Sequence, residues 1–397
     1  MFDGFQGSSV SDFAVRQMPA ELLLGQLSEN SADDTVKEAL RQAFVSVDSE
    51  YFKTATDAIM SWLVLRQDPK IRPGDPTLQK LEAQASIGAS ATVAVLLGQK
   101  LFVAGCGDTR AVLCLRLPAT GEIKAVRLSV DHVLGNEDEE LRLSQLGLDT
   151  TAAEAALSPP GYTRCLGFHR VKGGYKEEEA LAGARDEPVT AEPEIHGGIA
   201  LEPSFQFLLI FTRSLSDCLS QLVSFDGDVA LELCRLTLEQ FAENSSATGV
   251  AQSVVDKIVR AHREQFAMEE SAAAACSTRE DISLLVRQFN ARLAKKKSGA
   301  GASMLSSSSS SSAMMADRVV GVARAAEDTI TSSSRPPQLR PTLSSTTTES
   351  SEVFAKSVKE VPVDENGRIK PYVDFSHFHR EFKKYQECQR RQNGGAV

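Results

Sequence analysis

Four apolar segments between residues 91 and 130 follow one another so closely that they constrain the fold more than any other feature of the sequence. Gly98–Gln99 separates the first two segments, and Gly107–Asp108 separates the second from the third. Short connections that contain glycine are typical of hairpins, in which neighbouring strands pair antiparallel. We therefore expect strands at Ala91–Leu97, Leu101–Gly105, Ala111–Leu115 and Ala125–Val130.

Helical periodicity flanks these strands. A predicted helix begins at Ser11, and a second begins in the region Ser31–Asp34 and extends to about Leu65. Proline and glycine predict a loop at Asp68–Pro76. Further elements are expected as helices at Asp138–Gln145, Val229–Ala242 and Val250–Phe266, and as strands at Phe205–Phe211 and Ile282–Phe289. Grouped strands with helices on either side indicate an α+β sandwich.

The composition changes near residue 290 and divides the chain into three parts. Apolar residues recur densely in residues 1–290, which are long enough to bury a sizeable core. Residues 291–360 are rich in Ser and Thr, have little apolar periodicity and include the serine run Ser306–Ser312. Such a segment buries too little surface to offset its ordering entropy, so we expect a disordered linker. Residues 361–397 form a separate C-terminal segment.

The charge of the chain is unevenly distributed. The whole chain has a formal net charge of −10. Residues 291–397 hold 17 Lys and Arg against 11 Asp and Glu, which leaves residues 1–290 with 26 against 42, a formal charge of −16. An acidic body is poorly suited to the phosphate backbone of nucleic acid. We therefore expect no nucleic-acid partner.

The cysteines and the lack of long apolar stretches indicate the compartment. Seven cysteines form no CxxC pair, and Cys106 and Cys114 stand inside apolar segments, which predicts buried free thiols. No stretch approaches the roughly 18 apolar residues of a membrane helix. The N-terminus lacks the basic and apolar regions of a secretory signal. We expect a cytoplasmic protein without membrane insertion.

Four sequence motifs restrict the class of fold further. GASATVAVLL, LFVAGCGDTRAVLC, LSVDH with NEDEELRLSQLG, and TAEPEIHG occur in order. In this order they resemble successive landmarks of the type-2C metal-dependent protein phosphatases. The resemblance implies a sandwich of two antiparallel β-sheets flanked by helix pairs. Because the sequence begins at Met1, it also implies that the first strands of that fold, with a metal-binding Glu and a phosphate-binding Arg, are absent.

The same resemblance implies where a metal centre is expected. In that family, carboxylates hold Mg²⁺ or Mn²⁺, and the metals activate a water against a phosphate ester. Arg213, in FLLIFTRSLSD, stands where the family has an acidic ligand, and Glu280 stands where it has an Asp. A guanidinium opposes the binding of a dication, which needs several oxygen ligands. The matching positions near the metals are Asp3, Gly4, Asp108, Asp217 and Glu280.

We therefore expect a catalytically inactive pseudophosphatase that holds no metal and no other cofactor. On this interpretation Asp3, Asp108 and Glu280 are turn or surface carboxylates without an ion. Two alternatives stay open. One is a Mg/Mn-dependent protein serine/threonine phosphatase that tolerates Arg213, and the other is a cleft that binds phosphopeptides without hydrolysis.

Further motifs resemble pseudophosphatases of this family that bind and activate a MAP kinase kinase kinase. They are AELLLGQL, RVKGGY, LLVRQF and, near the C-terminus, DENGRIKPYVDFSHF. The last motif is similar to the kinase-docking segment of such proteins. It implies a kinase-binding site with the residues Tyr372, Val373, Phe375, Phe378 and Phe382.

The C-terminal segment also has a physical argument of its own. Its large apolar residues form one stripe of a helix that begins near Asp374, and such a helix on a flexible tether can lie in a groove of a partner. Periodicity alone leaves open that this helix packs on its own body. The resemblance implies a non-catalytic regulatory subunit that binds the catalytic domain of a MAP kinase kinase kinase and promotes its autophosphorylation. It also implies a scaffold for stress, immune or cytokine signalling, with other signalling adaptors as partners.

Overall fold

The computed structural model describes most of residues 1–294 and one further segment. The chain divides into a first unit, residues 1–332, and a second unit, residues 333–397, and all described residues belong to the first. The described ranges are 1–24, 27–68, 70–72, 74–158, 160–222, 228–268, 280–294 and 320–325.

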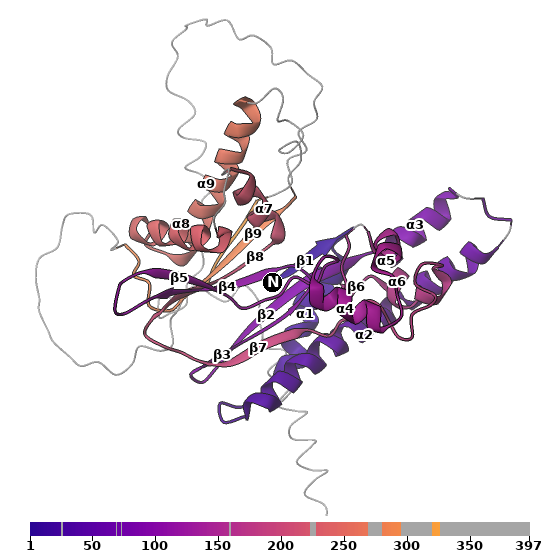
Figure 1. The fold of residues 1–397 in the computed structure, drawn as a ribbon, viewed down its shortest axis with the longest axis horizontal. Coiled ribbons are helices and arrows are strands. Elements are labelled where there is room, and N and C mark those ends of the chain that lie inside the picture. Colours follow the sequence, from indigo (N-terminus) through magenta and orange to yellow (C-terminus); the bar gives the residue numbers. More distant parts are fainter. Residues whose placement is uncertain are drawn as a thin grey trace, which may run out of the picture. The chain divides into compact units, whose positions relative to one another are not determined.

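Among the described residues, two antiparallel sheets of five strands each form the centre of the first unit (Figure 1). The first sheet has the order β1-β2-β3-β7, with β6 also paired to β2, and the second has the order β10-β9-β8-β4-β5. The predicted α+β sandwich of two antiparallel sheets is confirmed. The strands are β1 (Phe2–Phe5), β2 (Gly88–Leu97), β3 (Lys100–Cys106), β4 (Arg110–Arg116), β5 (Ile123–Arg127), β6 (Leu166–Gly167), β7 (Glu194–Ala200), β8 (Phe205–Phe211), β9 (Ile282–Gln288) and β10 (Val320–Ala325).

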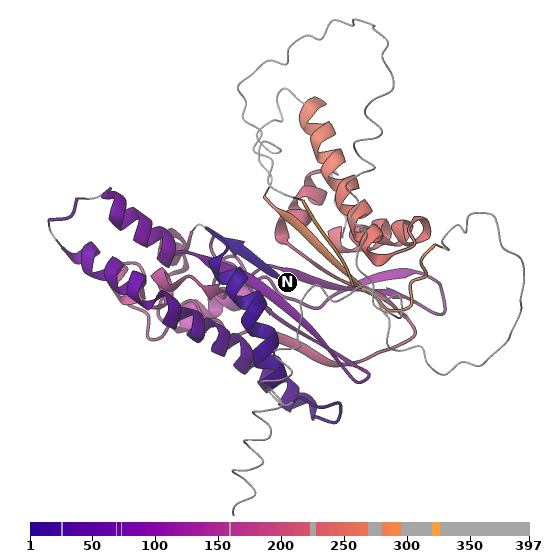
Figure 2. The ribbon, with the colours of Figure 1, turned by 180° about the vertical axis from the view of Figure 1, so that it is seen from behind.

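Helices cover the outer face of each sheet. The helices α1 and α2 pack on the first sheet (Figure 2), and α7, α8 and α9 pack on the second. Among the described helices, none is long and apolar enough to cross a bilayer. The helices are α1 (Ser9–Leu24), α2 (Asp33–Gln67), α3 (Pro76–Ala85), α4 (Glu137–Gln145), α5 (Thr150–Leu157), α6 (His169–Lys172), the 3₁₀ turn η1 (Tyr175–Glu177), α7 (Arg213–Leu222), α8 (Val229–Glu243) and α9 (Ala247–Met268).

Strand β8 illustrates how the sequence builds the layers. Successive side chains of a strand point to opposite faces. Phe207, Leu209 and Phe211 pack against the helices of the second sheet, whereas Leu208 and Ile210 pack between the two sheets. All seven residues of the strand are buried. A strand with two buried faces therefore lies in a middle layer of the sandwich.

Two elements lie where the sequence predicts a loop or a linker. Pro76 ends a predicted loop, yet it begins helix α3, because the Asp75 carboxylate accepts a hydrogen bond of 2.8 Å from the Thr77 amide and caps the first turn. Within the predicted linker, Val320–Ala325 forms strand β10, which pairs antiparallel with β9. The rest of residues 295–397 lies outside the described residues.

The cysteines of the described residues match the prediction for Cys106 and Cys114. None of these five forms a disulfide, and all are buried: Cys106, Cys114, Cys165, Cys218 and Cys234. Burial raises the pKa of Cys106 and raises that of Cys165 to about 12. These thiols therefore act as small apolar side chains of the core.

Candidate functional site

The turn between β3 and β4 holds Asp108 in a fixed position. The Ser90 hydroxyl of β2 accepts hydrogen bonds from the Asp108 and Thr109 amides, both at 2.8 Å. Gly107 has a φ of +96°, and a Cβ there would lie 2.5 Å from the Ser90 Oγ. Only glycine fits such a backbone so close to a neighbouring strand. The glycine of the Gly-Asp pair is thus required by the geometry of the turn.

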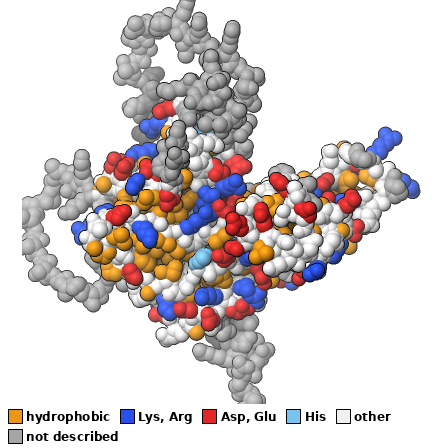
Figure 3. All heavy atoms as spheres, viewed as in Figure 1, with side chains coloured by type: hydrophobic (Ala, Val, Ile, Leu, Met, Phe, Trp, Pro, Cys, Tyr) orange, Lys and Arg blue, Asp and Glu red, His pale blue; other side chains and the backbone are white. Residues whose placement is uncertain are grey.

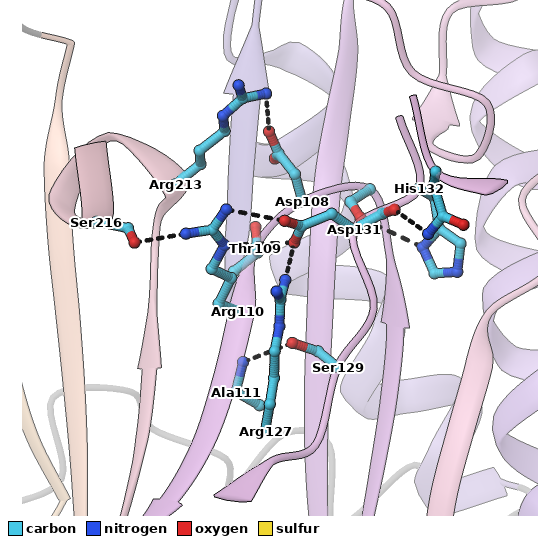
Figure 4. Close-up of polar contacts among 12 residues, drawn as sticks. Asp108, Thr109, Arg110, Ala111, Arg127, Ser129, Asp131, His132, Arg213 and Ser216 are labelled. Atoms are coloured by element: carbon cyan, nitrogen blue, oxygen red, sulfur yellow. Dashed lines mark hydrogen bonds and ion pairs between the residues drawn. The ribbon is translucent and has the colours of Figure 1, made fainter. Parts of the chain in front are cut away.

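The Asp108 carboxylate is buried and has two different neighbours. The Tyr162 hydroxyl donates a hydrogen bond of 2.9 Å to Oδ1. The Arg213 Nη1 lies 3.6 Å from Oδ2 (Figure 4). Burial raises the pKa of Asp108 even though Tyr162 and Arg213 favour its charged form. Burial and the Asp108 carboxylate likewise raise the pKa of Tyr162.

Arg213 is the first residue of helix α7 and joins two carboxylates. Its Nε lies 3.3 Å from the Asp217 Oδ2, one helical turn further on. About half of the Arg213 and Asp217 side chains is exposed, at 47% and 49%. Although burial opposes it, the charges of Asp217 and Asp108 raise the pKa of Arg213. The guanidinium therefore stays charged between these two acidic groups.

A second charged group lies beside the first and was not singled out from the sequence. Asp131 accepts a hydrogen bond of 2.8 Å from the Arg110 Nη2 and forms an ion pair with Arg127 (Figure 4). Arg110 also donates to the Ser216 hydroxyl of α7. Although burial opposes it, Arg110 and Arg127 lower the pKa of Asp131. The motif LSVDH contains Asp131 and was the available signal.

The structure places the other predicted site residues in different surroundings. Asp3 of β1 pairs in register with Ser90, which holds the Asp108 turn, and the charge of Asp3 contributes to the raised pKa of Tyr162. Gly4 follows in the same strand, and a Cβ there would lie 2.7 Å from the Gly7 carbonyl oxygen. Glu280 is exposed and precedes Asp281, whose carbonyl accepts a 2.6 Å hydrogen bond from Ser214 of α7.

The charges of this site alternate in sign. Figure 3 shows basic side chains next to acidic ones on the face that it views. Among the described residues, no three His, Cys, Asp or Glu side chains are grouped so that they hold a metal ion. The predicted kinase-binding residues lie outside the described residues: Tyr372, Val373, Phe375, Phe378 and Phe382.

Comparison with known sequences identifies the class of this fold and site. The family described as Protein phosphatase 2C matches residues 1–266. The chain therefore belongs to the protein phosphatase 2C family, and the resemblance seen in its motifs is confirmed.

Among its relatives are a kinase-binding protein and plant phosphatases. The chain is 24% identical over 295 residues to "TGF-beta-activated kinase 1 and MAP3K7-binding protein 1" of Caenorhabditis elegans, with 72% of this chain and 70% of that protein covered. It is 24% identical to "Probable protein phosphatase 2C 40" of Arabidopsis thaliana, with 72% of this chain and 61% of that protein covered. It is 25% identical to "Probable protein phosphatase 2C 59" of Oryza sativa subsp. japonica, with 66% of this chain and 65% of that protein covered.

Two solved structures align with part of this chain. A serine-threonine phosphatase 2C from Toxoplasma gondii aligns at a TM-score of 0.44 and 16% identity, covering 66% of this chain and 78% of that chain. A sex determining protein of C. elegans aligns at a TM-score of 0.42 and 16% identity, covering 66% of this chain and 52% of that chain.

Proposed function

We propose that this chain is a non-catalytic regulatory subunit that binds the catalytic domain of a MAP kinase kinase kinase and promotes its autophosphorylation. The supporting observation is its similarity, over 72% of its length, to a relative whose name states that it binds TGF-beta-activated kinase 1. Such activation is a population shift, because a partner that binds the active conformation more tightly favours it. The same protein would serve as a scaffold for stress, immune or cytokine signalling.

The geometry around Arg213 supports the non-catalytic part of this proposal. Hydrolysis through two metals requires several oxygen ligands directed at hard dications. Here the Asp108 and Asp217 carboxylates share one guanidinium, and Asp108 also accepts a hydrogen bond from Tyr162. These residues do not fit a two-metal centre, and we propose that the chain holds no metal or other cofactor.

We assign kinase binding to the C-terminal segment, residues 361–397. Large aromatic residues are frequent hot spots of interfaces, and Phe375, Phe378 and Phe382 recur at three- and four-residue spacing. Tyr372 and Val373 precede them and would fix the first turn. We also propose a cytoplasmic location, which the free, buried cysteines of the described residues support.

Titration calorimetry with the purified catalytic domain of TGF-beta-activated kinase 1 tests the assignment. We expect the full chain to bind and the Phe375→Ala/Phe378→Ala variant to lose roughly a thousandfold in affinity, since two hot spots of about 2 kcal/mol each sum to about 4 kcal/mol. Phe354→Ala, which changes an aromatic residue of the linker, is the matched control and should bind like the unchanged chain. Equal affinities for all three proteins would refute the assignment.

A second candidate function is a Mn²⁺-dependent protein phosphatase. It is favoured by membership of the phosphatase family and by the carboxylates of Asp3, Asp108 and Asp217. It requires hydrolysis of a phosphopeptide that rises with Mn²⁺ and falls in Asp3→Ala. Hydrolysis that is equal with Mn²⁺ and with a chelator would reject it.

A further inference from the structure

The buried Asp108 carboxylate needs a positive partner. Its side chain is 3% exposed, and an uncompensated charge at such a depth is costly. The Tyr162 hydroxyl satisfies Oδ1 but carries no charge. The guanidinium closest to Oδ2 among the ion pairs of the described residues is that of Arg213, at 3.6 Å. This distance is longer than a hydrogen bond, so the contact acts through charge.

The position of Arg213 on its helix is unfavourable for a cation. The N-terminus of a helix carries partial positive charge, which favours acidic residues in the first turn. Helix α7 begins with Arg213 and has no acidic residue in its first turn. The carboxylates of Asp108 and Asp217 offset this repulsion. Arg213 thus contributes to the site through these carboxylates rather than through helix formation.

Arg213 is the guanidinium that the Asp108 and Asp217 carboxylates share. Asp131 has Arg110 and Arg127 as partners, whereas Asp108 and Asp217 share Arg213. Removal of Arg213 takes this guanidinium away from both Asp108 and Asp217. Because both Asp108 and Asp217 point at one group, their oxygens converge on the place that the guanidinium takes.

We propose that Arg213 is a tethered counter-cation: it neutralises Asp108 and Asp217 and thereby excludes a free divalent cation from these two carboxylates. This inference rests on the non-catalytic part of the proposed function and is independent of kinase binding. It predicts that the folded chain gains no stability from Mn²⁺. It also predicts that, once Arg213 is replaced, Mn²⁺ can bind the carboxylates and stabilise the folded chain.

Thermal unfolding of full-length variants, with Mn²⁺ or with a chelator, tests the proposal. In the chelator, Arg213→Ala should lower Tm by several degrees, and adding Asp108→Asn should restore most of that loss because no buried charge is left. Mn²⁺ should raise the Tm of Arg213→Asp but not that of the unchanged chain or of Arg213→Asp/Asp108→Asn. Arg235→Asp, which reverses an exposed charge on α8, is the matched control and should not respond to Mn²⁺.

Two results would overturn the proposal. One is a Tm loss from Arg213→Ala that is the same in the unchanged chain and in the Asp108→Asn variant. That result would show that the two groups are not coupled. The other is a Mn²⁺-induced rise in the Tm of the unchanged chain that disappears in Asp108→Asn. That second result would also contradict the non-catalytic proposal, whereas the first would leave it standing. If Arg213→Asp does not fold, the Arg213→Ala pair still decides.

Discussion

Two ion pairs of this molecule differ in how their charges are satisfied. Lys172 of α6 lies 2.7 Å from the Asp48 Oδ2 and donates a second hydrogen bond of 2.7 Å to the Cys165 carbonyl. The other Asp48 oxygen accepts a hydrogen bond of 2.6 Å from the Gly167 amide. At the second pair, Arg213 lies 3.6 Å from Asp108 and is half exposed.

The difference indicates that the Lys172 pair has a structural role and that the Arg213 pair does not. The Lys172 side chain is 4% exposed, and its partners join α2 to the segment around β6 and α6. That segment includes Phe168, which is buried with a φ of 60°, a costly conformation that its surroundings must maintain. Arg213 instead faces solvent and holds two carboxylates loosely. We infer that the first pair maintains the fold and that the second sets the charge of the site around Asp108.

Loss of Lys172 should have the largest effect. Lys172→Ala leaves Asp48 buried without its cation, and we expect a loss of about 3–5 kcal/mol in the free energy of unfolding. Urea unfolding followed by circular dichroism measures it. Arg41→Ala is the control, since it breaks an exposed pair with Glu38 and should change stability little. Similar losses in the two variants would contradict a structural role for the Lys172 pair.

The pH dependence of stability should report on the same region. Burial lowers the pKa of His169 from 6.5 to about 4, and the ring stacks on Tyr51. Below pH 6.5 the unfolded chain takes up a proton that the folded chain refuses. The free energy of unfolding should therefore fall by up to about 1.4 kcal/mol per pH unit as the pH drops from 6.5 towards 4. Urea unfolding at a series of pH values measures this slope.

The control for this slope is His169→Phe. Phenylalanine keeps an aromatic ring beside Tyr51 and Phe52 but cannot titrate. We expect a smaller loss of stability in this variant over the same pH range. An unchanged slope would assign the pH dependence to other groups.

A substitution at Gly4 distinguishes a role in packing from a role in metal binding at the site that contains Arg213. A Cβ at Gly4 would lie 2.7 Å from the Gly7 carbonyl oxygen and 2.9 Å from the Ser11 Oγ. Gly4→Ala should therefore cost about 1–3 kcal/mol in urea unfolding, in the presence or absence of Mn²⁺. Gly183→Ala, with no atom within 4 Å of its Cβ, should be nearly neutral. A cost of Gly4→Ala that depends on Mn²⁺ would instead indicate a metal ligand.

Asp108 should give the smallest effect, with a sign opposite to that of His169. Burial raises the pKa of Asp108 above 3.8. The folded chain therefore holds this proton at a pH where the unfolded chain has released it, and stability falls as the pH rises through that window. Asp108→Asn should remove this fall in acid urea titrations while leaving the His169 slope intact. The same pH profile in both proteins would contradict a raised pKa of Asp108 in the folded chain.

The sequence predicts the layers of this fold better than its connections. Strand β8 was predicted with its observed bounds, Phe205–Phe211, because a continuous apolar run is unambiguous. Strand β1 was not predicted, since its four residues include Gly4 and show no alternation. The short helix α5 and the helix α7 were also missed, because α5 has only eight residues and the α7 segment was interpreted through its charges.

The site was predictable in part for a similar reason. Motif resemblance assigned Asp108, Arg213 and Asp217 to one place, and the structure brings them together. Their lack of a metal stays a proposal. Tyr162 and Asp131 were not predicted as members, because the resemblance gave them no role and their partners lie 54 and 21 residues away in the sequence. Such contacts are set by how the strands and loops meet, which residue spacing does not encode.

The most direct test of the central claim is activation-loop autophosphorylation of the purified kinase domain, followed over time with and without this chain. We expect the unchanged chain and Phe354→Ala to accelerate autophosphorylation to the same extent. This acceleration should not require Mn²⁺. Phe375→Ala/Phe378→Ala should not accelerate it, although its thermal unfolding should match that of the unchanged chain. Equal acceleration by all three proteins, or by none, would contradict an activator that acts through its C-terminal aromatic residues.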